Sequence, residues 1–295
     1  GSAEITSLKS TGDANLTTAG ALTLGAGEFK DVTITSDSAE ITSLKSTGEA
    51  NLTTTGALTL GTGEFVKVTM TSNNGSVEVS NLTSSNNVAI NSENGNTTLG
   101  TLNVDGTFDA VTKGLEIITG MDVGGKVTIT STGDVVVTPD VTLSDLEITS
   151  AKDVTFGNLK VLNVASITND GKLKLETGEF ADITINSGSA GITNIKATGT
   201  SNLTTTGALK LETGEFADIT INSDSAEITS LKSTGDANLT TKENLKLGTG
   251  DFAGVTMTSN NGSVEVSNLI SSNNVVINSN NGNTTLGTLN VDGTF

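Results

Sequence analysis

Ile5-Thr-Ser-Leu-Lys-Ser-Thr-Gly12 decides the fold, because it returns unchanged as Ile41-Thr-Ser-Leu-Lys-Ser-Thr-Gly48, at a step of 36 in the numbering. Phe29 returns as Phe65 at the same step. Within this repeat unit, apolar and polar residues alternate over short runs, as in Val32-Thr-Ile-Thr35, and this alternation is typical of half-buried strands. Glycine, aspartate and asparagine separate the runs and indicate turns. No stretch keeps a helical periodicity, so the sequence predicts an all-β protein.

The repeat unit divides into two similar halves. Ala3-Glu-Ile5 lines up with Leu22-Thr-Leu24, and Ala14-Asn-Leu16 lines up with Val32-Thr-Ile34. One half alone cannot bury its apolar side, whereas stacked halves can. We therefore expect a parallel β-helix, or β-solenoid, of about 18 residues per coil and about 16 coils, with about three short strands per coil. Like residues should then form rows along the stack.

A second, longer period shows how the coils are organised. Residues 1–108 are repeated nearly unchanged as residues 188–295, with 109–187 as intervening coils. The sequence thus predicts a single solenoid rod over residues 1–295, and we interpret it as a fragment of a longer repeat array. Strands at the ends of a solenoid expose unpaired backbone groups. We expect flanking sequence or an end-to-end partner to cover them.

The inward positions of this pattern give a predicted core. Phenylalanines recur at the step of the full repeat unit, which places them two coils apart, and the equivalent position in the alternate coil falls near Ser10. Large and small layers should therefore alternate in the interior. The predicted structural core contains Ile5, Leu8, Leu16, Leu22, Leu24, Phe29, Val32, Ile34, Phe65, Phe108, Phe180, Phe216 and Phe252.

Composition excludes several kinds of chemistry. The chain has 15 lysines, no arginine, 33 acidic residues and a net charge of −18, and it lacks histidine and cysteine. It therefore has no thiol nucleophile, no histidine base or metal ligand and no guanidinium clamp for phosphate. An acidic chain of this kind is a poor nucleic-acid binder. No apolar run approaches the ~20 residues of a membrane span. We expect no cofactor and no metal, because the Asp-Gly pairs lack the spacing of calcium loops.

The plentiful acids are the first candidates for catalysis, since glycoside hydrolysis needs two carboxylates. These acids recur once per repeat beside turns, however, whereas an active site is normally single. No cluster of acids that departs from the repeat pattern is evident in residues 109–187. We predict solvated turn charges and no enzyme activity, with a polysaccharide-cleaving β-helix as an alternative. The recurring acids are Glu28, Asp31, Glu64, Glu179, Asp182, Glu215 and Asp218.

Outward threonines form a second candidate surface. In Val32-Thr-Ile-Thr35 the aliphatic residues face inward, so Thr33 and Thr35 face outward, and the motif recurs at Val68 and Val127. Such flat Thr-x-Thr arrays occur in ice-binding solenoids, so ice binding stays open as an alternative. Threonine is also simply favoured in strands.

Asparagines followed by Ser or Thr at the second position form a third candidate set, as sites of glycan attachment. In a chain this rich in Asn, Ser and Thr, many such matches arise by chance. The candidate acceptors are Asn15, Asn51, Asn74, Asn81, Asn96, Asn202, Asn238, Asn261 and Asn283.

Runs such as Ser10-Thr-Gly-Asp-Ala-Asn-Leu-Thr-Thr18 and Thr71-Ser-Asn-Asn-Gly-Ser-Val-Glu-Val79 resemble the repeats of large bacterial exoproteins. The resemblance is to filamentous-haemagglutinin and high-molecular-weight adhesin proteins, which are exported by two-partner secretion. It implies a right-handed parallel β-helix and a location on or outside the bacterial cell. It also implies a role in adhesion, in biofilm or as a delivery stalk. We therefore expect a non-enzymatic structural or adhesive filament. Its expected partners are further copies of itself, end to end or laterally, or glycans and proteins of a host or neighbouring cell. The alternative is an adhesin whose repeat faces bind glycans or neighbouring rods directly.

Overall fold

The computed structural model describes residues 1–295 and contains strands but no helix. Contacts divide the chain into two compact units, Gly1–Lys152 and Asp153–Phe295. The strands of the first unit are β1 (Ala3–Lys9), β2 (Ala14–Thr17), β3 (Ala21–Phe29), β4 (Val32–Ser36), β5 (Ser38–Ser46), β6 (Glu49–Thr54), β7 (Leu58–Phe65), β8 (Lys67–Ser72), β9 (Val77–Ser84), β10 (Val88–Val104), β11 (Phe108–Ser131), β12 (Val135–Val137) and β13 (Val141–Ser150).

The second unit has fewer but longer strands, because pairing continues around its corners. Its strands are β14 (Val154–Thr205), β15 (Ala208–Ser223), β16 (Ser225–Thr241), β17 (Leu245–Ser259), β18 (Val264–Ser271), β19 (Val275–Ser279) and β20 (Thr284–Val291). β14 alone has 52 residues. A straight strand of that length would extend about 170 Å, so β14 must wind through more than one turn.

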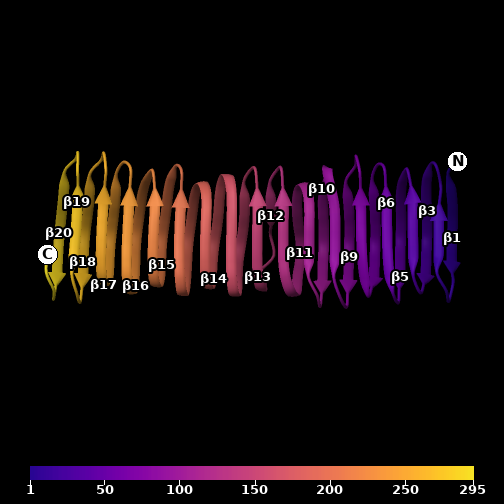
Figure 1. The fold of residues 1–295 in the computed structure, drawn as a ribbon, viewed down its shortest axis with the longest axis horizontal. Coiled ribbons are helices and arrows are strands. Elements are labelled where there is room, and N and C mark those ends of the chain that lie inside the picture. Colours follow the sequence, from indigo (N-terminus) through magenta and orange to yellow (C-terminus); the bar gives the residue numbers. More distant parts are fainter. The chain divides into compact units, whose positions relative to one another are not determined.

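The strands pair in parallel, and each pair joins one turn to the next. In the first unit Ala3 pairs with Leu22 and Ala14 with Val32, which are the partners that the sequence predicts. Figure 1 shows the strands of each unit lying side by side in successive turns. The prediction of an all-β parallel β-helix is confirmed. Its handedness, and a single rod through all 295 residues, stay predictions.

The turns differ slightly in length from the prediction. There are about 15, spaced ~19 residues apart, so the expected spacing was slightly short and the expected number of coils slightly high. Loop length at one corner explains the difference. Between Ser36 and Ala39 the chain needs two residues, whereas between Ser72 and Val77 it needs four. The longer corner loops lengthen single turns without disturbing the stacking of the strands on either side.

The core consists of inward rows of side chains. The predicted core residues that are buried are Leu22, Leu24, Phe29, Val32, Ile34, Phe65, Phe108, Phe180, Phe216 and Phe252. Ile5, Leu8 and Leu16 are half-buried, and each pairs in register with a buried residue of the following turn. They lie in the first turn, which has a neighbouring turn on one side only.

The phenylalanines are separated by small residues, as the two-coil period predicts. Phe29 pairs in register with Ser46, and Phe65 with Ser84. In the second unit Ser233 lies between Phe216 and Phe252. Each ring thus fills the space that the small side chain of the next turn leaves open.

One corner carries an inward row of hydroxyl side chains, here called the hydroxyl ladder. Most of these hydroxyls donate to carbonyl groups of the corner loops, as Thr54 does to Gly56 at 2.6 Å and Ser72 does to the same carbonyl at 2.7 Å. Ser36 and Ser223 are the exceptions, because their hydroxyls have no hydrogen-bond partner. Backbone oxygens that cannot join the parallel pairing are thereby satisfied. The ladder contains Thr18, Ser36, Thr54, Ser72, Ser92, Thr112, Ser131 and Ser150 in the first unit and Ser187, Thr205, Ser223, Thr241, Ser259 and Ser279 in the second, with Asn169 at the equivalent position.

Candidate functional site

The recurring glutamates lie on the surface and pair with lysines of the preceding turn. Lys45 Nζ lies 2.6 Å from Glu64 Oε2, and Lys9 and Glu28 form the equivalent pair one repeat earlier. The hydrogen bond from Lys9 lowers the pKa of the Glu28 carboxyl. Because the acids alternate with lysines along the stack, neighbouring turns present opposite charges to each other. The acids do not gather into a catalytic cluster.

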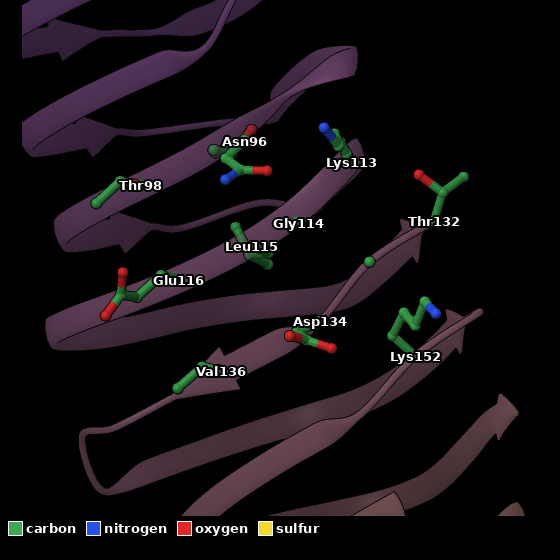
Figure 2. Close-up of a pocket in the computed structure, with 12 residues that line it drawn as sticks. Asn96, Thr98, Lys113, Gly114, Leu115, Glu116, Thr132, Asp134, Val136 and Lys152 are labelled. Carbon is green, nitrogen blue, oxygen red and sulfur yellow. The ribbon is translucent and has the colours of Figure 1, made fainter. Parts of the chain in front are cut away.

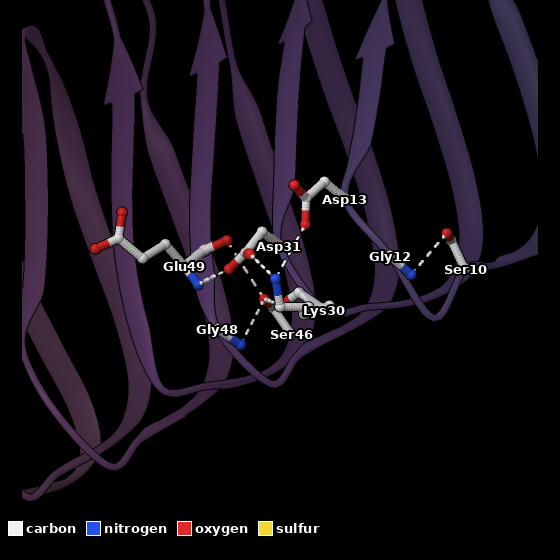
Figure 3. A network of polar contacts seen from close by, with 8 residues as sticks. All are labelled: Ser10, Gly12, Asp13, Lys30, Asp31, Ser46, Gly48 and Glu49. Carbon is white, nitrogen blue, oxygen red and sulfur yellow. Dashed lines mark hydrogen bonds and ion pairs between the residues drawn. The ribbon is translucent and has the colours of Figure 1, made fainter.

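The recurring aspartates have a different structural task, which Figure 3 shows for Asp31. Its Oδ1 accepts the backbone N–H of Glu49, one turn later, at 2.7 Å. Lys30 Nζ lies 3.3 Å from the other carboxylate oxygen. These two contacts, the N–H of Glu49 first, lower the pKa of the Asp31 carboxyl. The carboxylate therefore fixes the corner of the next turn.

This cap recurs along both units. Asp182 accepts the N–H of Thr200 at 2.7 Å, and Asp218 accepts that of Asp236 at 2.9 Å. Glycine makes room for the cap, because a Cβ at Gly48 would lie 2.0 Å from Asp31 Oδ1. The sequence prediction of solvated turn charges missed this role. The available signal was a glycine at a constant spacing after each of these aspartates.

The other sequence candidates lie apart from one another. No group of three or more acidic side chains is placed so that it could hold a metal ion. The outward threonines form rows with asparagine: Thr33 pairs with Asn51, and Asn51 with Thr69. All the candidate glycan acceptors are exposed except Asn202, which is half-buried. Whether any of them carries a glycan stays a prediction.

One groove interrupts the regular surface of the first unit, and it is drawn in Figure 2. Its volume is about 700 Å³. It forms where the corner loop shortens, since Thr112 and Leu115 enclose only two residues, whereas Ser92 and Thr97 enclose four. The groove is lined by Asn96, Thr97, Thr98, Lys113, Gly114, Leu115, Glu116, Thr132, Gly133, Asp134, Val136 and Lys152.

The groove contains two acids that sequence reasoning did not bring together. Glu116 and Asp134 lie in neighbouring turns of the segment that is not duplicated. In Figure 2 their side chains extend in opposite directions. Together with Asn96 and the rim lysines Lys113 and Lys152, they offer hydrogen-bonding groups to a ligand.

Comparisons of the chain with protein-family models, with curated proteins and with solved structures give no match. The structure contains no helix suited to span a bilayer. Its stacked parallel turns define a β-solenoid repeat protein.

Proposed function

We propose that this chain is a non-enzymatic scaffold, part of an extracellular filament or stalk on a bacterial surface. The observation that carries the proposal is the way its polar groups are used. Lysines pair with glutamates of the next turn, aspartates cap the next corner, and inward hydroxyls satisfy corner carbonyls. Most of these polar side chains therefore contact a neighbouring turn. The number of repeats sets the length of such a scaffold.

Electron microscopy of the producing cells tests the proposal. Gold-labelled antibodies against the purified chain should mark extended material outside the cell. Treatment of intact cells with protease should remove the label, because a surface filament is accessible from outside. Label confined to the cell interior and protected from protease would contradict the proposal.

A second candidate function is adhesion through the repeat faces. The rows of Thr33, Asn51 and Thr69 present hydroxyl and amide groups at the regular spacing of the turns, about 4.8 Å. Such groups suit the hydroxyls of an extended polysaccharide. Binding of the purified chain to immobilised glycans, lost on the change Asn51→Lys and kept on Asp37→Asn at the corner that follows β4, would favour this function over a purely structural one.

A further inference from the structure

The second unit carries a continuous strip of alternating charge. The strip contains Lys160, Glu179, Lys196, Glu215, Lys232 and Asp251. Lys160 and Glu179 lie 3.0 Å apart, and the side chains of all six residues are between 50% and 61% exposed. From Lys196 onward each member pairs in register with the next. Positive and negative groups therefore succeed one another at the spacing of the turns, and the strip as a whole is neutral.

A row of small and apolar side chains runs beside the charge strip, two residues further along each turn. It contains Leu162, Ala181, Thr198, Ala217, Thr234 and Ala253. Leu162 is 53% exposed. Two shallow hollows open along these rows, of about 230 Å³ between Lys160 and Thr198 and about 290 Å³ between Lys196 and Thr234. The surface is thus indented where the side chains are small, and a partner can approach closely.

We infer that the charge strip and its small-residue row form a lateral docking surface for a second copy of this chain, laid antiparallel. The order of charges explains the orientation. A strip of six that begins with lysine and ends with an acid complements its own reverse. Lys160 then lies opposite Asp251 of the second copy, and Glu179 lies opposite Lys232 of that copy. A parallel copy in the same register would set lysine against lysine.

Two physical arguments select a second copy over an unrelated partner. A solenoid with the same rise per turn, about 4.8 Å, stays in step with the strip over all six turns, whereas a partner with another period falls out of step. The net charge of −18 also makes most contacts between copies repulsive. Neutral, self-complementary rows are where this repulsion is low, and the charge strip is the row that extends over six turns and has the two hollows beside it. Charge pattern fixes register more than it adds affinity.

The inference goes beyond the proposed scaffold, and it does not depend on where the protein is located. Exposed charge pairs contribute little each, so we expect a weak, concentration-dependent dimer. In an array with many strips, simultaneous contacts would raise the overall affinity without any new kind of contact. Lateral bundles of rods are the expected result.

A charge-inverted variant tests the docking surface. It carries Lys160→Glu, Glu179→Lys, Lys196→Glu, Glu215→Lys, Lys232→Glu and Asp251→Lys. Every neighbour within the strip keeps an opposite charge, so the variant should fold with an unchanged circular dichroism spectrum and thermal midpoint. It should also dimerise with itself. Mixed dimers with the original chain should be at least about tenfold weaker than either homodimer, because like charges then face each other across the contact.

Sedimentation velocity over a concentration series measures dimerisation, and native mass spectrometry of the mixture measures the mixed species. The matched control inverts a second alternating row of the same unit, Lys210→Glu, Glu227→Lys, Lys246→Glu and Glu265→Lys, whose neighbouring turns also pair in register. This control should form mixed dimers at the statistical proportion. A chain that stays monomeric at all concentrations, or an inverted strip that mixes statistically, would overturn the inference. Neither result would change the outcome of the cell-labelling experiment.

Discussion

Buried hydroxyl groups show how one residue type is stabilising or costly according to its neighbours. Thr54 is fully buried, and its hydroxyl donates to the Gly56 carbonyl at 2.6 Å. Thr97 is equally buried, but its hydroxyl has no hydrogen-bond partner. It lies in the aliphatic row between Val77 and Leu115, which offers no acceptor. A buried polar group without a partner costs about 1–3 kcal/mol.

Replacing each threonine with valine, which has nearly the same shape, should therefore have opposite effects. Thr97→Val should raise the free energy of unfolding by about 1 kcal/mol, because it removes the unpaired hydroxyl. Thr54→Val should lower it by about 1 kcal/mol, because it removes a hydrogen bond to the corner. Guanidinium unfolding of both variants measures the two changes. A shift of the same sign in both would show that hydrogen bonding does not decide these sites.

Turns are joined at the scale of the element by side chains that reach from one corner to the next. Asp31 and its counterparts accept a backbone N–H of the following turn, and Asn87 and Asn244 do the same at 3.0 and 2.8 Å. Asparagine and aspartate are thus interchangeable as acceptors, and only aspartate titrates. The corner cap is a property of the pair of turns, since neither turn contains both partners.

The folded-state pKa of Asp31 is lowered, so the stabilisation it contributes is present above its unfolded pKa and is lost as the pH falls through the folded value. Acid below about pH 4 should therefore weaken this cap. Asp31→Asn keeps an acceptor for Glu49 and removes the titration. Its thermal midpoint should fall less between about pH 7 and pH 3 than that of the original chain. Circular dichroism melts measure this, with Asp37→Asn, an exposed acid at the opposite corner, as the control. An equal fall in Asp31→Asn would contradict the argument.

The structural repeat of the whole molecule is a pair of turns. Phe29 stacks against Ser46, and Glu28 stacks between Lys9 and Lys45. Both the size of the inward residues and the sign of the outward charges therefore alternate from turn to turn. Deleting two turns therefore preserves this alternation, whereas deleting one turn breaks it.

Two deletions test the two-turn repeat. Removing residues 30–65 joins Phe29 directly to Val66, which is the neighbour that Phe65 has in the original chain. This variant should keep a cooperative transition with nearly unchanged midpoint. Removing residues 30–46 stacks Phe29 on Phe65 and Glu28 on Glu64. Overpacking of this kind costs about 1–3 kcal/mol, so its denaturant midpoint should be clearly lower. Equal midpoints would mean that single turns are interchangeable.

The sequence by itself determined the class of fold and much of the register. The alternation of apolar and polar residues defines the strands. The apolar position of Ala3 recurs at Leu22, and that of Ala14 recurs at Val32, which already gives the pairing of neighbouring turns. Identical residues at a fixed step can stack only if a whole number of turns spans that step. The buried phenylalanines and the small residues between them follow from the same period.

Only the tertiary structure decided what the polar groups do. Asp31 meets the N–H of Glu49, the short loop at Gly114 leaves a groove, and Lys160 begins a strip of alternating charge. Each of these features joins residues of different turns within a few ångströms of each other. Loop length sets which residues meet, and loop length varies from turn to turn. The repeat pattern describes the average turn, whereas these sites depend on the individual ones.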